Sequence, residues 1–291
     1  MCTSEKSRII RKAYAKINLG LDVTGRRPNG YHDVKMIMQT VDLYDILTLE
    51  KTEEPGIFVE TGREDLPGDK SNLVYRAAEC MIRAGGITEG VRICLEKRIP
   101  MAAGMAGGST DAAAVFHGMN ELFGLGMSRE DLCRLGVEIG ADVPYCIHGG
   151  TALAEGIGER LTPLPAPPEC ILVIAKPDID VSTKYVYENL HLESLQRHPD
   201  IDGMQEAICQ GSLEGLTERM ENVLESVTAV RYPVIGALKS LMCAGGAENA
   251  LMSGSGPTVF GVFREQEQAA KVCEEIRKQG LAEEVFLSRW I

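Results

Sequence analysis

The residues with the clearest chemical meaning form a loop rich in glycine and alanine. An alternating strand is predicted for residues 91–95, and a helix is predicted from about Thr110 to Phe123. Glycine lets the backbone approach a ligand closely, and a helix N-terminus offers unpaired N–H groups and a partial positive charge. The segment is therefore a candidate phosphate-binding site, although a tight turn that merely packs a helix has the same composition. This glycine-rich loop consists of Pro100, Met101, Ala102, Ala103, Gly104, Met105, Ala106, Gly107, Gly108, Ser109 and Thr110.

The glycine-rich loop matches neither of the two common nucleotide-binding fingerprints. No lysine follows a glycine with the spacing G-x-x-x-x-G-K-[ST], and the loop contains no clean G-x-G-x-x-G. A P-loop or Rossmann enzyme is therefore disfavoured. Ser109 and Thr110 stand where hydroxyl groups either cap the helix or bind phosphate oxygens or a metal.

An acidic and a basic residue are candidates for moving protons and stabilising charge. Asp142 follows a helix predicted for residues 131–139 and precedes Pro144, which restrains the backbone there. Its carboxylate could accept a proton from a hydroxyl group that attacks a γ-phosphate, but aspartate is also common in helix-terminating turns. Lys16 and Asn18 alternate with apolar residues in a predicted strand and so share one face. That face is either part of a site or simply solvated.

Two further segments could contact a substrate. Tyr31 and His32 follow a turn at residues 26–30, and they supply an aromatic ring and an imidazole that could grip a base, although a lone histidine is more often structural. Near the C-terminus, a serine- and glycine-rich segment lies between two apolar strand-like runs. It is either a second anion-binding loop or an ordinary hairpin connection. Its residues are Ser253, Gly254, Ser255 and Gly256.

Composition excludes several classes of protein. The 291 residues carry a net charge of −12, which argues against a general nucleic-acid-binding surface. The nine cysteines are scattered and never form C-x-x-C, which favours reduced thiols over a disulfide framework or a zinc site. No apolar run approaches the roughly 18 residues of a membrane-spanning helix. Since residues 1–8 also lack the apolar stretch of a secretion signal, we expect a cytoplasmic protein with no membrane partner.

The order of the predicted elements indicates an α+β fold. Residues 9–50 are rich in strand patterns, and helices and strands then follow in mixed order without strict βαβ alternation. The densest group of prolines lies at residues 162–168 and is typical of a boundary between domains. We therefore expect an N-terminal domain over residues 1–162 and a C-terminal domain over residues 163–291.

Taken together, these segments resemble the GHMP kinases. The shared features are an N-terminal strand with Lys16, a P-x-x-x-G-x-x-G-G-S-[ST]-[DN]-A-A loop at residues 100–113, and an S-G-S-G-P loop at residues 253–257. The segments A-Y-A-K-I-N-L at residues 13–19, G-Y-H at 30–32 and G-A-D-V-P at 140–144 resemble in particular the diphosphocytidyl-methylerythritol kinases of that superfamily. The resemblance covers roughly residues 10–263.

The resemblance implies a fold and a reaction. The fold is a two-lobe GHMP kinase fold with mixed and antiparallel sheets, an ATP-binding N-terminal lobe, and the active site in the cleft between the lobes. The reaction is ATP-dependent phosphorylation of the 2-hydroxyl group of 4-diphosphocytidyl-2-C-methyl-D-erythritol, in the non-mevalonate isoprenoid pathway. The partner implied is this small cytidine diphosphate derivative. The oligomeric state is not predicted.

The resemblance also implies roles for the candidate residues. Asp142 is the expected general base, and Lys16 is expected to offset developing charge, with Asn18 contacting the substrate beside it. Tyr31 and His32 are expected to bind the cytidine. The backbone of residues 101–110 is expected to cradle the triphosphate, and residues 253–257 to border the substrate diphosphate or the transferred phosphoryl group. Mg²⁺ is expected to bridge the β- and γ-phosphates, but no residue is assigned as its ligand.

Two other functions are compatible with parts of this pattern. A homoserine, mevalonate or phosphomevalonate kinase would share the glycine-rich loop but not the G-Y-H turn. A catalytically silent nucleotide-binding regulator would have no chemical reason to keep both Lys16 and Asp142. One departure concerns Ala106, where many superfamily members have glycine, so we expect the backbone there to avoid positive φ.

Overall fold

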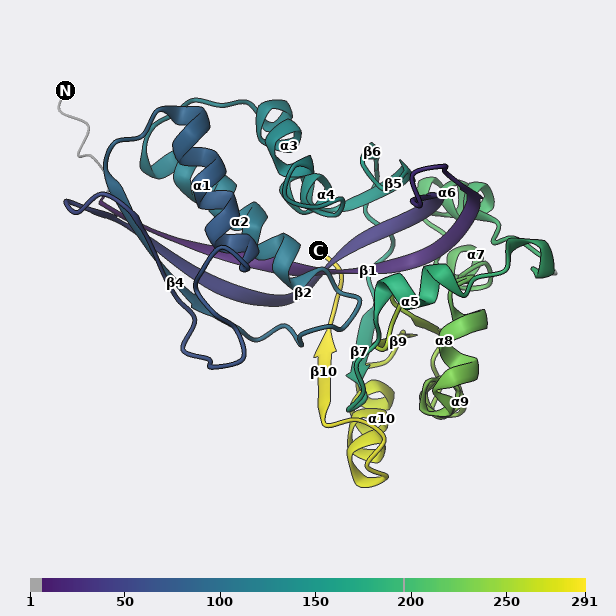
Figure 1. The fold of residues 1–291 in the computed structure, drawn as a ribbon. Coiled ribbons are helices and arrows are strands. Elements are labelled where there is room, and N and C mark those ends of the chain that lie inside the picture. The colour runs from purple at the N-terminus through teal and green to yellow at the C-terminus, as the bar shows by residue number, and fades with distance from the viewer. Residues whose placement is uncertain (1–6, 196) are drawn as a thin grey trace. The chain divides into compact units, whose positions relative to one another are not determined.

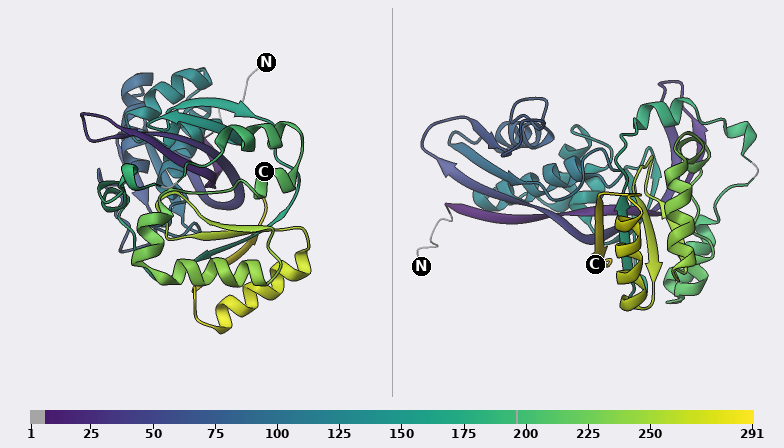
Figure 2. Two further views of the ribbon diagram at one scale, coloured as in Figure 1. Left: turned by 90° about the vertical axis from the view of Figure 1, so that its right-hand side faces the viewer. Right: turned by 90° about the horizontal axis from the view of Figure 1, so that it is seen from below.

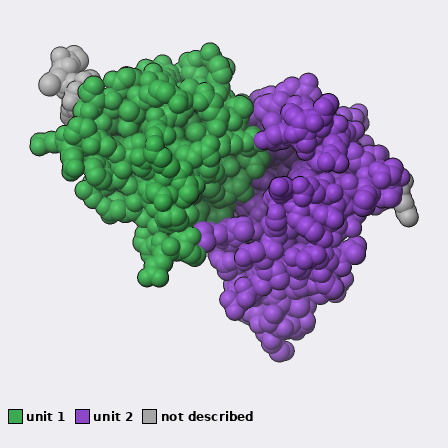
Figure 3. Space-filling model, in the orientation of Figure 1, with its two compact units in different colours: residues 1–15, 43–99, 106–149 green, residues 16–42, 100–105, 150–291 purple. Residues whose placement is uncertain are grey.

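A computed structural model describes residues 7–195 and 197–291 of the chain (Figure 1). The N-terminal segment used above to argue against a secretion signal lies largely outside the described residues, as does Cys2. The eight cysteines within the described residues are free thiols. The chain divides into two compact units, coloured separately in Figure 3, and each takes its residues from three segments of the chain.

Unit 1 comprises residues 7–15, 43–99 and 106–149. Its strands include the start of β1 (Arg8–Arg26) and the end of β2 (His32–Thr52). Strand β4 (Gly90–Glu96) pairs antiparallel with β2, and β3 (Ile57–Glu60) pairs parallel with β4. Helices cover one face of these strands (Figure 1), and Gly118 of α2 lies so close to Leu49 of β2 that an added Cβ would come within 2.8 Å of the leucine side chain. The other elements are α1 (Leu73–Gly85), α2 (Gly107–Leu122), α3 (Arg129–Val137) and α4 (Val143–His148).

Unit 2 comprises residues 16–42, 100–105 and 150–291. The first part of β2 pairs with β5 (Thr151–Gly156), and β5 pairs with β6 (Arg160–Leu164), both antiparallel. Most of β1 (Arg8–Arg26) also belongs to this unit, and Leu21 forms a bridge with Asn222. The start of β1 and the end of β2 belong to unit 1, so both strands run through both units.

A second, entirely antiparallel sheet of unit 2 has the order β10-β7-β9-β8. Two helices, α9 (Pro233–Ala244) and α10 (Gln266–Lys278), pack side by side against this sheet (Figure 2). The strands are β7 (Ile171–Lys176), β8 (Asn249–Met252), β9 (Val259–Phe263) and β10 (Glu284–Ser288). The helices of unit 2 are α5 (Thr183–Glu188), the 3-10 turn η1 (Leu192–Ser194), α6 (Ile201–Cys209), α7 (Leu213–Thr217), α8 (Glu225–Arg231), α9 (Pro233–Ala244) and α10 (Gln266–Lys278).

The mixed arrangement confirms the predicted α+β class. Two local expectations change: α2 begins at Gly107 rather than near Thr110, and Pro163 lies within β6. Proline is tolerated there because β6 is an edge strand, paired only with β5. The domain boundary after residue 162 and an active site between two lobes stay predictions. Within the described residues, no helix has the length and apolarity needed to cross a membrane.

Candidate active site

The glycine-rich loop has an unusual backbone. Ala102, Gly104 and Ala106 all have positive φ, at 49°, 71° and 56°. The expectation that Ala106 avoids this region is wrong: Ala106 is the left-handed N-cap residue of α2. A left-handed alanine costs about 1–2 kcal/mol, so the surrounding structure must impose the conformation. Such strain is concentrated at ligand-binding segments.

The first turn of α2 is open at its N-terminus. No side chain caps the helix, because the N-cap position is occupied by Ala106. Thr110 is engaged elsewhere, since its hydroxyl donates to the carbonyl oxygen of Tyr14 at 2.7 Å. Gly108 is exposed and Ser109 half-buried, whereas Ala103 and Met105 are buried in unit 2. The start of α2 can therefore offer backbone N–H groups to an anion.

Lys16 is buried in β1 with an exposed fraction of 5%. Its ammonium group donates to Asn18 Oδ1 at 2.7 Å and to the carbonyl oxygen of Gly104 at 3.1 Å. Both acceptors are neutral, and within the described part of unit 2 no carboxylate forms an ion pair with Lys16. Asn18 is buried beside it, with its amide 3.2 Å from the sulfur of Met36. Burying an ammonium without an opposite charge is costly, so Lys16 is a candidate for binding an anion.

Three segments that are distant in sequence meet at Gly104. Its carbonyl oxygen accepts hydrogen bonds from Lys16 Nζ and, at 3.0 Å, from Ser253 Oγ. Gly254 lies next to Lys16, since a Cβ on Gly254 would be 3.6 Å from Lys16 Nζ and 3.5 Å from Asn18 Oδ1. Unit 2 therefore brings together the lysine strand, the first part of the glycine-rich loop and the serine-glycine segment.

Replacing Gly104 with alanine should lower the free energy of unfolding by about 2–4 kcal/mol. This loss is the sum of two costs, the left-handed backbone conformation of the alanine and the overpacking by its Cβ. The reason is that a Cβ would lie 2.3 Å from the carbonyl oxygen of Ser253. Gly280→Ala is the matched control, because Gly280 has φ +64° with nothing within 4 Å of the added atom. Urea unfolding should show the larger loss for Gly104. Equal losses would mean that the crowding at Ser253 carries no energetic weight.

The serine-glycine segment is held by side chains that the sequence analysis did not identify. Asn222 donates to the carbonyl oxygens of Met252 and Gly254, both at 2.8 Å. The hydroxyl of Ser255 lies 2.9 Å from that of Thr183. The hydroxyls of both serines thus bond within the protein, and positive φ at Gly254 and Gly256 shapes the turn between them. Backbone groups, more than serine side chains, are left for a ligand.

The predicted base-binding residues have different surroundings. Tyr31 is 56% exposed, whereas His32 is buried at 8% exposure. The His32 ring lies 5.1 Å from the ring of Tyr187, centroid to centroid, with 37° between the planes. Burial lowers the pKa of His32, and the charge of Arg26 lowers it further. A neutral imidazole at neutral pH can both donate and accept a hydrogen bond.

Asp142 lies in unit 1 as the N-cap residue of α4, with Pro144 in the first turn. Its side chain makes no capping hydrogen bond. The helix packs against α2 and α3, which fixes the backbone of Asp142 relative to the start of α2. A Cβ added at Gly140 would lie 4.0 Å from Ser109 Oγ, so the two predicted motifs of unit 1 are neighbours.

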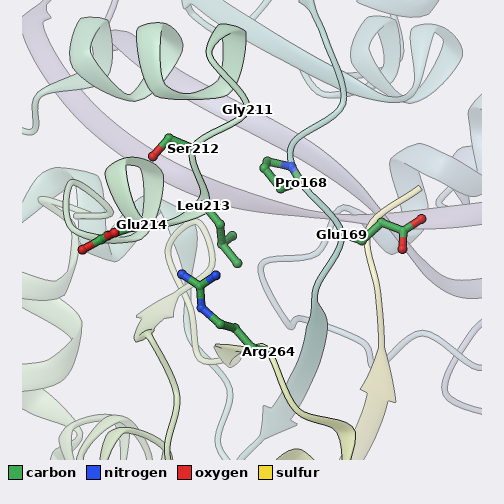
Figure 4. A pocket seen from close by; sticks show the side chains of 7 residues that line it. All are labelled: Pro168, Glu169, Gly211, Ser212, Leu213, Glu214 and Arg264. Atoms are coloured by element: carbon green, nitrogen blue, oxygen red, sulfur yellow. The ribbon is translucent and has the colours of Figure 1, made fainter.

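A cavity of about 430 Å³ in unit 2 contains none of the predicted site residues (Figure 4). It is lined by residues 168–169, residues 211–214 and Arg264. Arg264 forms an ion pair with Glu248, so its charge already has a partner. The cavity is therefore separate from the junction at Gly104 and provides no argument about catalysis.

Comparison with known proteins identifies the relatives of this chain. Residues 72–150 match the GHMP kinases N terminal domain, and residues 204–282 match the GHMP kinases C terminal domain. A protein of Lachnoclostridium phytofermentans named 4-diphosphocytidyl-2-C-methyl-D-erythritol kinase is 53% identical over 96% of both chains. A protein of the same name from Enterococcus faecalis is 47% identical over 97% of this chain and 98% of its own.

Solved structures agree with these relatives. A crystal structure of 4-(cytidine 5'-diphospho)-2C-methyl-D-erythritol kinase has a TM-score of 0.83 at 34% identity, covering 97% of this chain and 99% of the other. Homoserine kinase from Cytophaga hutchinsonii has a TM-score of 0.81 over 100% and 99% of the two chains, but its 22% identity shows a common fold only. The chain therefore belongs to the GHMP kinases and, within them, to the family of 4-diphosphocytidyl-2-C-methyl-D-erythritol kinases.

Proposed function

We propose that this protein transfers the γ-phosphoryl group of ATP to the 2-hydroxyl group of 4-diphosphocytidyl-2-C-methyl-D-erythritol, in the cytoplasm, as a step of the non-mevalonate isoprenoid pathway. The observation that carries the proposal is the buried ammonium of Lys16, whose hydrogen-bond acceptors within the described part of unit 2 are neutral and which lies at the junction of three motif segments. A phosphate-bearing substrate supplies the negative charge that this position lacks. The names of the relatives at about 50% identity support the choice of acceptor.

In the proposed reaction, Asp142 accepts the proton of the 2-hydroxyl group as its oxygen attacks the γ-phosphorus. A new P–O bond forms, the bond to the β,γ-bridging oxygen breaks, and ADP leaves. Lys16 offsets negative charge that develops on the attacking and equatorial oxygens. The N–H groups at the start of α2 and the backbone of residues 101–110 hold the triphosphate.

Mg²⁺ fits the residues present, provided that it enters with ATP. Among the described residues, no three carboxylate, histidine or cysteine side chains form a metal-binding group. Magnesium commonly keeps several waters and uses one or two protein ligands together with substrate phosphates, so a complete protein cage is not required. When bound, the ion would neutralise charge on the β- and γ-phosphates. We assign no residue as its ligand.

The cytidine is proposed to bind at His32 and Tyr187, with Tyr31 nearby in sequence and exposed. Replacing Tyr187 with alanine should raise KM for the cytidine substrate about 10-fold, because an aromatic–base stack contributes about 1–3 kcal/mol. KM for ATP should stay the same. Tyr185→Ala is the control, since that ring lies against Arg231, 4.7 Å from the guanidinium. An equal rise in KM for Tyr185→Ala would refute the assignment.

The proposed function is tested by ADP release from MgATP with four acceptors. The acceptors are 4-diphosphocytidyl-2-C-methyl-D-erythritol, homoserine, mevalonate and phosphomevalonate. Turnover with the cytidine compound alone is the expected result. Turnover with another acceptor would overturn the cytidine assignment while keeping the kinase activity, and the absence of turnover with all four would favour a silent regulator.

A further inference from the structure

Three charged side chains are buried together in unit 1. They are Asp45 of β2, Lys97 directly after β4, and Asp111 of α2, with exposed side-chain fractions of 0%, 4% and 3%. Lys97 Nζ forms an ion pair with Asp45 Oδ2 and donates to Asp111 Oδ2 at 2.9 Å. One cation thus faces two carboxylates in a space closed to water. We call these three residues the charge cluster.

The charge cluster fixes the chain on both sides of the glycine-rich loop. Asp45 Oδ1 accepts hydrogen bonds from the backbone N–H groups of Arg98, at 2.5 Å, and of Ile99, at 2.8 Å. These two residues directly precede Pro100. Asp111 is the fifth residue of α2 and directly follows Thr110, the last residue of the loop. The ion pair between Lys97 and Asp111 therefore joins two points 14 residues apart and closes the base of the loop.

Lys97 also lies directly against the first residue of α2. A Cβ added to Gly107 would be 3.2 Å from Lys97 Nζ and 3.2 Å from Ile99 Cγ2. The absence of a side chain at Gly107 thus leaves room for the ammonium group beside the helix N-terminus. Any displacement of Lys97 would shift the turn whose N–H groups are proposed to meet the triphosphate.

Stability alone is a poor explanation for the charge cluster. Buried ion pairs can often be replaced by apolar residues of similar size without loss of stability. Asp111 Oδ1 adds a further cost, because it is buried and has no hydrogen-bond partner among the described residues. Burial raises the pKa of Asp111 well above its ordinary value, although the charge of Lys97 opposes that rise. The molecule therefore keeps an unfavourable arrangement at the base of its proposed phosphate-binding segment.

We propose that Asp45, Lys97 and Asp111 are positioning residues for ATP binding: they hold both ends of the glycine-rich loop and the start of α2 in the geometry that receives the triphosphate. This inference rests on the proposed kinase function. The three residues act through the backbone that they fix, and not by touching the reacting atoms. A preformed loop loses less conformational entropy when the nucleotide binds, so the cluster increases affinity.

Two substitutions of Asp111 separate positioning from packing. Asp111→Asn keeps an oxygen that can accept from Lys97, whereas Asp111→Leu keeps a similar volume and removes the acceptor. Binding of a non-hydrolysable ATP analogue with Mg²⁺ should be within about 2-fold of wild type for the asparagine variant. It should be about 10- to 100-fold weaker for the leucine variant, because the loop must then be ordered when the nucleotide binds. Titration calorimetry gives these affinities without turnover.

A triple variant tests whether the effect is only a loss of stability. Asp45→Asn, Lys97→Met and Asp111→Leu together remove all three buried charges, and the asparagine oxygen can still accept from the backbone N–H groups of Arg98 and Ile99. This variant should unfold at a temperature close to that of wild type, yet bind the analogue at least about 10-fold more weakly. Lys51→Met is the control, because Lys51 forms an ion pair with Glu89 at the surface of the same unit. The affinity of this variant for the ATP analogue should stay within about 2-fold of wild type.

The inference is wrong if the triple variant keeps both the thermal stability and the nucleotide affinity of wild type, or if Asp111→Leu binds as tightly as Asp111→Asn. Failure of the proposed function has a different signature. In that case the wild-type protein binds the ATP analogue but does not phosphorylate the cytidine compound, and the comparison of variants by calorimetry still stands.

Discussion

Asp142→Asn is expected to lower kcat about 10³-fold while the affinity for ATP stays within about 2-fold, because removal of a general base typically costs 10²–10⁴-fold in rate. Asparagine has the size of aspartate but cannot take the hydroxyl proton. The backbone around residue 142 is held by Pro144 and by the packing of α4 on α2 and α3. Since the Asp142 side chain makes no capping hydrogen bond, its loss should not unfold α4. Single-turnover kinetics and nucleotide titration measure the two quantities.

Asp131→Asn is the matched control for this experiment. Asp131 also belongs to a helix start in unit 1, but its carboxylate completes a capping box with Ser128 at the N-terminus of α3. We expect this variant to lose about 0.5–1 kcal/mol of stability and to keep kcat within about 2-fold. If Asp142→Asn kept more than a tenth of wild-type kcat, or lost ATP binding to the same extent as kcat, the base assignment would fail.

Local pattern was sufficient to predict the strands and helices that carry several of the candidate segments. Alternation along residues 13–19 predicted that Lys16 and Asn18 share a face, and their side chains are 2.7 Å apart. The strand before the glycine-rich loop and the helix after it were also predicted, since they follow from periodicity. Such contacts need only the local geometry of one element. That is why the sequence was informative there.

Tertiary contacts account for what the sequence did not predict. Ala106 adopts the left-handed conformation that its side chain disfavours, because the chain on both sides of it is fixed by the rest of the fold. Thr183 meets Ser255 across 72 residues, a pairing that no local pattern encodes. The start of α2 was missed because Gly107 and Gly108 are poor helix formers. Helix α4 has only six residues, too few to show a hydrophobic period.

Lys16→Met is the second variant with a large expected effect, and it should lower kcat about 10²–10³-fold, the usual cost of removing one donor that stabilises transition-state charge. Methionine keeps the length and apolar volume of the side chain but has no charge. Because the ammonium of Lys16 is buried against neutral acceptors, its removal also removes a desolvation cost. The carbonyl of Gly104 keeps its hydrogen bond from Ser253. The variant should therefore stay folded, with unfolding free energy within about 1–2 kcal/mol of wild type.

Kinetic comparison decides between charge stabilisation and simple substrate binding at Lys16. A loss of kcat at saturating substrate means that the ammonium acts more strongly on the transition state than on the bound substrate. A rise in KM for the cytidine compound with unchanged kcat would instead make Lys16 a ground-state binding residue and would overturn the proposed role. Lys35→Met provides the control, since Lys35 lies in the same unit and already pairs with Asp202 at 2.6 Å. If kcat falls while stability is kept, Lys16 is a buried cation that serves turnover and not folding. The proposed phosphate site requires such a cation, because its partner charge arrives only with the substrates.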